Sequence, residues 1–344
     1  MATASGRRPK QIRDFILRNL RLHPVDITRF TADHFRISRP AVLHHINALS
    51  DEGALKISGE TRGRRYELAP ISEASLELPI SPDLKEDAVW REKIRPILNG
   101  VPSNVLSICQ YGFTEILNNA IDHSEGTTAL VYVRRDVDLI RMLIVDNGIG
   151  IFTKIARDFH LDDPRHAILE LAKGKLTTDP DRHTGEGVFF ASRIFDRFSL
   201  LSSNLFFTHR TDGDDWLLET EDSGEGTSVI MEIDTDSART TQEVFDRFSS
   251  GQDRYAFTRT HVPVALARYG DENLVSRSQA RRLLTRFERF EEVFLDFDGI
   301  ETIGQAFADE IFRVFAAEKP DTRLTYTNTT PAVNDVIKRA LNPS

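Results

Sequence analysis

The chain contains almost no cysteine and none of the features of a membrane segment. Among its 344 residues are 1 Cys, 3 Met and 2 Trp. The single Cys109 cannot form an internal disulfide, which is typical of a reducing compartment. No apolar run approaches the ~18 residues that a membrane-spanning helix needs, and the basic start at residues 1–10 lacks the apolar run of a signal peptide. We therefore expect a cytoplasmic protein without membrane contact.

Length and charge indicate several units of different character. A chain of 344 residues is long for one hydrophobic core, so two or three domains are expected. The net charge of -9 is unevenly distributed, because residues 1–70 contain 13 Lys/Arg against 7 Asp/Glu and the remainder contains 31 against 46. A basic head on an acidic body favours a nucleic-acid partner for the head alone.

The head has the pattern of three helices and a β-hairpin. Apolar spacing predicts helices over residues 11–22 and 26–35. A third helix is expected after Ser38, an N-cap residue type, with Pro40 in its first turn and an end near Gly53. Residues 54–57 and 65–68 are predicted to pair as strands around a turn.

This order, with its arginine-rich hairpin, resembles the winged helix-turn-helix of bacterial transcription regulators. The resemblance implies double-stranded DNA as a partner of residues 36–68, with the third helix in the major groove and the wing on phosphates. The residues expected at DNA are Arg39, His44, His45, Arg62, Arg64 and Arg65. Winged folds also serve in docking or dimerisation, and that alternative stays open.

The rest of the chain predicts two further units. Residues 71–100 are expected to be a proline-containing linker over 71–85 and a connecting helix over 88–98. Residues 101–236 predict a helix (104–123), two strands (128–134, 139–146), a long irregular segment, a helix (187–195) and strands ending at 227–233. Residues 237–344 alternate strands (254–262, 293–297, 323–326) with helices (276–289, 304–317, 331–341). The expected fold class is α/β (α+β).

Two polar residues in the first helix of the middle unit are candidate site residues. Glu115 and Asn119 are four apart and therefore project from one helix face. An Asn oxygen suits Mg²⁺, and a Glu one turn away can accept a proton from a water or hydroxyl that attacks a phosphate. The same pair is also common on solvated helix faces, so the spacing alone leaves both interpretations open.

Glycine-rich stretches follow at two later points. Asp146 ends an apolar strand, and a carboxylate there suits the exocyclic amine of adenine. Gly148 and Gly150 permit positive φ and close approach to a flat base. Gly185 and Gly187 precede a predicted helix, whose free N–H groups can hold phosphate. An ordinary turn and an ordinary helix start are the alternatives.

The sequence order EILNNA, DNGIGI, TGEG and GEGT, followed by an apolar strand, is similar to the Bergerat-fold (GHKL) ATPases over residues 104–233. This resemblance implies ATP and Mg²⁺ as cofactors and a mobile lid over residues 152–184. Asn119 then corresponds to the metal ligand, Glu115 to the general base and Asp146 to the adenine ligand. The other implied nucleotide-binding residues are Gly148, Gly150, Gly185, Gly187, Thr227 and, in the lid, Lys175.

The residues around these motifs bear on which kind of Bergerat-fold protein the chain resembles. Residues 71–100 contain no histidine, so the phosphoacceptor of a histidine kinase is missing there, and residues 119–124 are closer to anti-sigma serine kinases. Residues 293–300 and the following helix resemble STAS domains, whose partner kinases phosphorylate a serine at the helix start. Residues 303–310 carry no hydroxyl, so the segment looks more like divergent STAS-like domains of unknown function.

Together these patterns predict an ATP-binding regulatory protein. Mg-ATP binding, with or without hydrolysis, would control DNA binding by the head or partner binding, for which the STAS-like unit is a candidate surface. One alternative is an anti-sigma-type serine/threonine kinase that acts on a separate protein. Another is an ATPase adaptor that uses the winged unit to dimerise. The sequence leaves open whether the protein is an enzyme and whether it forms a homodimer.

Overall fold

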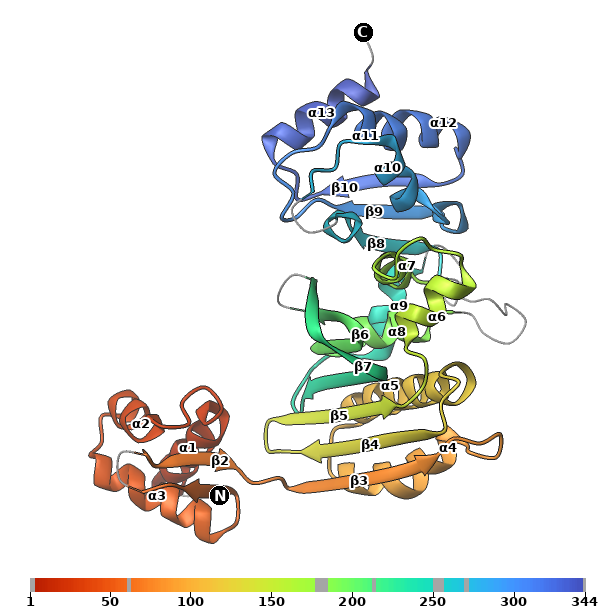
Figure 1. Ribbon diagram of the computed structural model, residues 1–344. Helices are drawn as coiled ribbons and strands as arrows, with labels where there is room; N and C mark the ends of the chain where they lie inside the picture. The colour runs from red at the N-terminus through yellow and green to blue at the C-terminus, as the bar shows by residue number, and fades with distance from the viewer. Residues whose placement is uncertain are drawn as a thin grey trace.

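The computed structural model describes residues 4–60, 63–176, 185–211, 215–249, 257–268 and 272–342. The fold class is α/β, as expected. Three units follow one another along the chain, with the N-terminus in the first and the C-terminus at the far end of the third (Figure 1). Within the described residues, no helix is both long and apolar enough to cross a membrane.

The N-terminal unit consists of three helices and a two-stranded antiparallel hairpin with a hydrophobic core of their own. The elements are α1 (Ala4–Asn19), α2 (Ile27–Phe35), α3 (Arg39–Asp51), β1 (Leu55–Ser58) and β2 (Arg65–Leu68). Ser38 caps α3 as predicted, because its Oγ accepts a hydrogen bond from the Ala41 N–H at 3.3 Å. Val42, Ile46 and Leu49 form the buried face of that helix.

A five-stranded antiparallel sheet forms the middle unit, in the order β3-β4-β5-β7-β6. Its strands are β3 (Ser72–Pro79), β4 (Thr128–Arg135), β5 (Leu139–Asp146), β6 (Arg197–Arg210) and β7 (Trp216–Asp234). The expectation of a linker over residues 71–85 is therefore wrong at β3. Alternate side chains of β3 are half-buried, and Pro79 is tolerated because β3 is an edge strand of this sheet.

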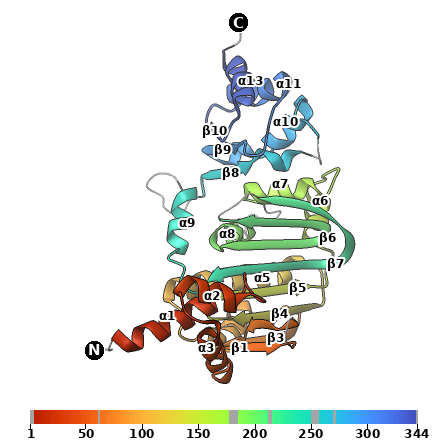
Figure 2. The same cartoon turned by 90° about the vertical axis from the view of Figure 1, so that its left-hand side faces the viewer.

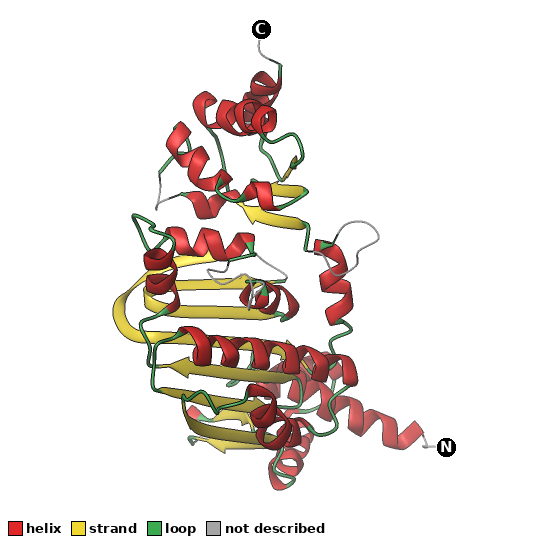
Figure 3. Cartoon of the chain, turned by 90° about the vertical axis from the view of Figure 1, so that its right-hand side faces the viewer, coloured by secondary structure: helices red, strands yellow, loops and turns green. Residues whose placement is uncertain are grey.

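Helices cover one face of this sheet, and the long helix α5 (Ser103–His123) lies over the strands (Figure 3). A bent helical segment joins β3 to α5, made of α4 (Glu86–Val89), η2 (Trp90–Ile94) and η3 (Arg95–Leu98). Helix α5 packs closely at Gly112, where an added Cβ would lie 2.3 Å from the ring of Phe195, between α8 and β6, and 3.0 Å from the sulfur of Met231 on β7. This close packing fixes the polar face of α5 over the strand ends.

The segment after β5 was expected to be irregular, and the structure corrects this. It contains α6 (Ile151–Asp158) and α7 (His166–Lys173), followed after residues 177–184 by α8 (Gly187–Ile194). Residues 177–184 lie outside the described residues. Figures 1 and 2 show α7 between the sheet and the C-terminal unit, and α7 packs against β8 of that unit.

The C-terminal unit contains three parallel strands in the order β10-β9-β8. These are β8 (Arg259–Pro263), β9 (Glu292–Asp296) and β10 (Arg323–Thr327). Its helices are α9 (Thr241–Phe248), η4 (Val264–Ala267), α10 (Arg277–Leu284), η5 (Phe287–Arg289), α11 (Gln305–Asp309), η6 (Glu310–Phe315), α12 (Ala316–Glu318) and α13 (Pro331–Leu341). One continuous hydrophobic core runs from Val89 to Ala340, so the middle and C-terminal units are packed as a single body.

The N-terminal unit contacts the sheet at the turn between β4 and β5. Asp136 in this turn is 4% exposed and forms ion pairs with Arg21 and, at 2.9 Å, with Arg134. Arg21 also pairs with Asp138 at 3.2 Å, and Arg134 donates to the Leu68 carbonyl at 2.9 Å. A buried carboxylate needs such partners, so this cluster fixes where the head lies on the sheet.

Candidate functional site

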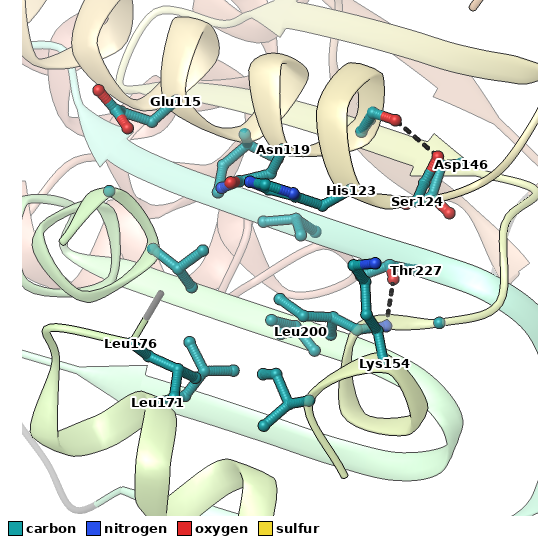
Figure 4. Close-up of a pocket in the computed structure, with 18 of the residues that line it drawn as sticks. Glu115, Asn119, His123, Ser124, Asp146, Lys154, Leu171, Leu176, Leu200 and Thr227 are labelled. Atoms are coloured by element: carbon teal, nitrogen blue, oxygen red, sulfur yellow. Dashed lines mark hydrogen bonds between the residues drawn. The ribbon is translucent and has the colours of Figure 1, made fainter. Parts of the chain in front are cut away.

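A cavity of about 360 Å³ opens between α5, the sheet and the segment that carries α6 and α7. This volume falls in the range of small-molecule sites. Figure 4 shows polar side chains from α5 and the strand ends on one side, and Leu171, Leu176 and Leu200 on the other. Such a mixture of an apolar wall and a few polar groups suits a flat, partly charged ligand.

Among the residues of α5 that line this cavity, three polar ones lie at successive helical turns. Glu115, Asn119 and His123 recur every four residues and therefore share one helix face (Figure 4). The structure thus brings together Glu115 and Asn119 as the sequence predicted. His123 was missed as a site residue, although continuing the same four-residue spacing by one step would have found it.

Asp146 lies at the end of β5, directly opposite Thr227 of β7. Its Oδ1 accepts a hydrogen bond from the Gly148 N–H at 2.9 Å, and Thr227 also bonds to it. Thr227 Oγ1 in turn accepts from the Ile151 N–H at 2.9 Å (Figure 4). Burial raises the pKa of Asp146, and the bonds from Gly148 and Thr227 oppose that shift. The carboxylate therefore lies at the cavity in a fixed orientation.

The glycines after Asp146 have different roles. Gly148 lies against the end of α5, where an added Cβ would be 2.0 Å from the Ser124 carbonyl oxygen. Gly150 lines the cavity with φ +84°, a value that favours glycine, and precedes α6. Gly150 therefore meets the expectation of a positive φ beside the ligand space, whereas Gly148 has no positive φ, does not line this cavity, and is needed for the close approach of the turn to α5.

Gly185 and Gly187 also line the cavity, at the N-terminus of α8. Gly185 has φ +68°. The Glu115 carboxylate lies against Gly187, because a Cβ added there would be 2.0 Å from Glu115 Oε2. This end of the cavity therefore combines two kinds of group. The N–H groups of a helix start can bind a phosphate, and a carboxylate beside them can accept a proton from an attacking water.

Lys175 does not meet the expectation that it reaches phosphates in the cavity. Its Nζ donates to the Arg289 carbonyl at 2.9 Å and lies over the rings of Phe257 and Phe290, so it is directed to the C-terminal unit. Lys154 of α6 lines the cavity instead and is ion-paired with Glu125 at 3.1 Å. The sequence could not identify Lys154 because α6 itself was not predicted.

The residues expected at DNA fall into two groups. Arg39 and His44 on α3 and Arg64 and Arg65 at the hairpin are exposed, while Arg62 lies outside the described residues. The expectation that His45 faces DNA does not fit the structure, since its side chain is half-buried beside α1. Burial, with the Arg13 and His44 charges, lowers its pKa and disfavours the cation that a phosphate would attract.

Comparison with known proteins adds one assignment. Residues 279–334 match the model of a STAS-like domain of unknown function (DUF4325). No curated protein matches the chain. The C-terminal unit is therefore STAS-like, as its sequence suggested, and this domain type carries no assigned activity.

Proposed function

We propose that the chain is an ATP-binding regulatory protein whose nucleotide occupies the cavity beneath α5. The observation that supports this is the placement of complementary groups at its two ends. Asp146, held by Thr227 and Gly148, offers an acceptor for the adenine amine. Glu115 lies against Gly187 at the N-terminus of α8, where the phosphates would bind, and Asn119 lines the cavity one helical turn away. This arrangement supports membership of the middle unit in the Bergerat-fold ATPases.

The groups in the cavity also suit Mg²⁺. Within the described residues, no group of three or more His, Cys, Asp or Glu is placed to hold a metal ion alone. Mg²⁺ typically binds one or two protein oxygens together with nucleotide phosphates and waters. Asn119 would supply such an oxygen, and Glu115 would act as the general base. Bound Mg²⁺ would neutralise phosphate charge and so assist hydrolysis.

The proposed output is DNA binding by the N-terminal unit, acting as a winged helix-turn-helix in the cytoplasm. Strand β5 joins the two sites, because Asp146 ends it and Asp138 immediately precedes it. Asp138 and the neighbouring Asp136 hold Arg21 of the head. A nucleotide that displaces the Asp146 end of this strand would therefore also act on the orientation of the head.

A direct test compares DNA binding with and without nucleotide. A duplex selected from a random-sequence pool would be titrated with the full chain, at several salt concentrations, with Mg-ATP or Mg²⁺ alone. The variant Asp146→Asn, for which we expect weaker nucleotide binding, provides the control at an Mg-ATP concentration that saturates the wild type but not the variant. We expect Mg-ATP to change the affinity of the wild type only. Equal affinity with and without Mg-ATP at every salt concentration would refute the coupling.

A second candidate is an anti-sigma-type serine/threonine kinase. It is favoured by Glu115, whose carboxylate could take the proton of an attacking hydroxyl at the phosphate end of the cavity. Incubating the protein with γ-labelled ATP and cell extract separates the two functions. Transfer of label to a second protein supports the kinase, whereas nucleotide binding without transfer supports the regulator.

A further inference from the structure

The segment that forms the outer wall of the cavity also contacts the C-terminal unit. We call residues 151–176 the lid segment. Leu171 and Leu176 of this segment line the cavity. Between them, Lys173 is fully buried and Lys175 is directed to the C-terminal unit. The lid segment thus has one face on the ligand space and the other on the STAS-like unit.

A buried ionic cluster fastens the two together. Lys173 Nζ donates to Glu170 Oε1 at 2.6 Å and to the carbonyls of Arg282 at 3.2 Å and Thr285 at 3.0 Å, at the end of α10. Arg286 pairs with Glu170 Oε2 at 3.1 Å. The Lys173, Glu170 and Arg286 side chains are 0%, 6% and 8% exposed, so the single Glu170 carboxylate compensates two buried cations, and its removal would leave both without a counter-charge.

Arg286 has the central place in this cluster. Its guanidinium also donates to the Gly174 carbonyl at 2.5 Å and lies 5.7 Å from the ring centre of Phe159, which lines the cavity. Its backbone is left-handed, with φ +65°, a conformation that is uncommon for a residue other than glycine. Such backbone strain persists where surrounding contacts compensate for it.

Further bonds join the same two elements. The Thr260 hydroxyl of β8 donates to the Lys173 carbonyl at 2.7 Å. Arg289 donates to the Lys175 carbonyl at 3.2 Å, and Lys175 donates to the Arg289 carbonyl, so the two residues are joined by reciprocal hydrogen bonds. Phe257 packs against Gly174, where an added Cβ would lie 2.5 Å from its ring. The rear of the lid segment is therefore bound to the STAS-like unit along residues 170–175.

We propose that Arg286 of the STAS-like unit is a positioning residue of the nucleotide site. By holding Glu170, Gly174 and Phe159 it keeps the outer wall of the cavity in place, so the C-terminal unit completes the site within the same chain. This role rests on the proposed nucleotide binding. It assigns to the STAS-like unit control of how fast nucleotide leaves, and a partner that binds this unit would act through the same contacts.

The test measures association and dissociation of a fluorescent ATP analogue from the full-length chain by stopped flow. Arg286→Ala should raise the dissociation rate constant by about tenfold or more, within the usual range of coupling between sites, and change association little. Arg286→Lys should give a dissociation rate constant between those of the wild type and Arg286→Ala, since the lysine ammonium can pair with Glu170 but lacks the planar guanidinium fork. Arg281→Ala is the matched control, because this residue of α10 pairs with Glu310 and is 70% exposed.

A second, milder variant distinguishes loss of the proposed contact from misfolding of Arg286→Ala. Thr260→Val keeps the shape of the side chain and removes only its bond to Lys173, so it should give a smaller increase in the same direction. Unchanged dissociation in both Arg286→Ala and Thr260→Val would refute the positioning role alone. Absence of binding by the wild type would refute the nucleotide site, and this role with it.

Discussion

Gly148→Ala is expected to damage both stability and nucleotide binding. An added Cβ would lie 2.0 Å from the Ser124 carbonyl oxygen and 2.6 Å from its carbon. These backbone atoms cannot move aside easily. The Ser124 carbonyl accepts from the Ile149 N–H at 2.9 Å, and the Ser124 hydroxyl donates to the Ala120 carbonyl at 2.6 Å. The turn must therefore separate from α5 to accept the methyl group.

The size of the effect follows from the steric overlap and from the hydrogen bonds that break when the turn moves. Overpacking costs about 1–3 kcal/mol. Loss of the Ile149–Ser124 and Gly148–Asp146 hydrogen bonds adds about 1 kcal/mol each. A free energy of unfolding lower by about 3–5 kcal/mol corresponds to a Tm lower by about 10 °C for a body of this size. Because the turn orients Asp146, ATP affinity should fall by about tenfold or more, the change that 1.4 kcal/mol produces.

Thermal unfolding by circular dichroism and titration with a fluorescent ATP analogue, well below the Tm, would measure the two effects. Gly224→Ala is the matched control, because an added Cβ there has nothing within 4 Å and should alter neither quantity. If Gly148→Ala kept the wild-type Tm and affinity, the turn would not be held against Ser124 as described.

Three further predictions concern catalysis, DNA and pH. Glu115→Ala should retain nucleotide but lose turnover in a phosphate-release assay, and persisting turnover would mean that Glu115 is not the base. Exchanging Arg64 and Arg65 for Glu should weaken DNA binding in a gel-shift titration, more at low salt than at high salt, and unchanged binding would exclude the hairpin from the interface. Burial raises the pKa of Asp146. ATP affinity should therefore fall as the pH drops through a value above the usual Asp range, while the folded state, which binds that proton more readily than the unfolded chain, gains stability. A pH profile of calorimetric affinity that is shared by Asp146→Asn would contradict this.

The elements that the sequence predicted well are those with local signals. The cap at Ser38 and the apolar spacing of α3, α5 and α13 depend on neighbours along the chain, so their bounds were close to those observed. The spacing of Glu115 and Asn119 likewise fixes their common helix face without knowledge of the rest of the fold.

The features that the sequence missed depend on distant partners. Strand β3 exists because β4 pairs with it, and the prolines at 70, 79 and 82, within and beside it, resemble those of a linker when β4 is not considered. Lys175 is directed to Arg289, more than a hundred residues away. His45 follows His44 directly on a helix, where consecutive side chains diverge by about 100°, so the two cannot share one exposed face.

Isothermal titration of Mg-ATP into the wild type and Asp146→Asn tests the central claim most directly. The substitution preserves size and the oxygen that accepts from Gly148, and it replaces the other, charged oxygen, which would accept from the adenine amine, with an amide NH2 that can only donate. We predict one binding site in the wild type and an affinity lower by about tenfold to a hundredfold in the variant, as expected for a hydrogen bond to a charged group. No binding by the wild type, or equal affinity in both proteins, would contradict the proposed nucleotide site.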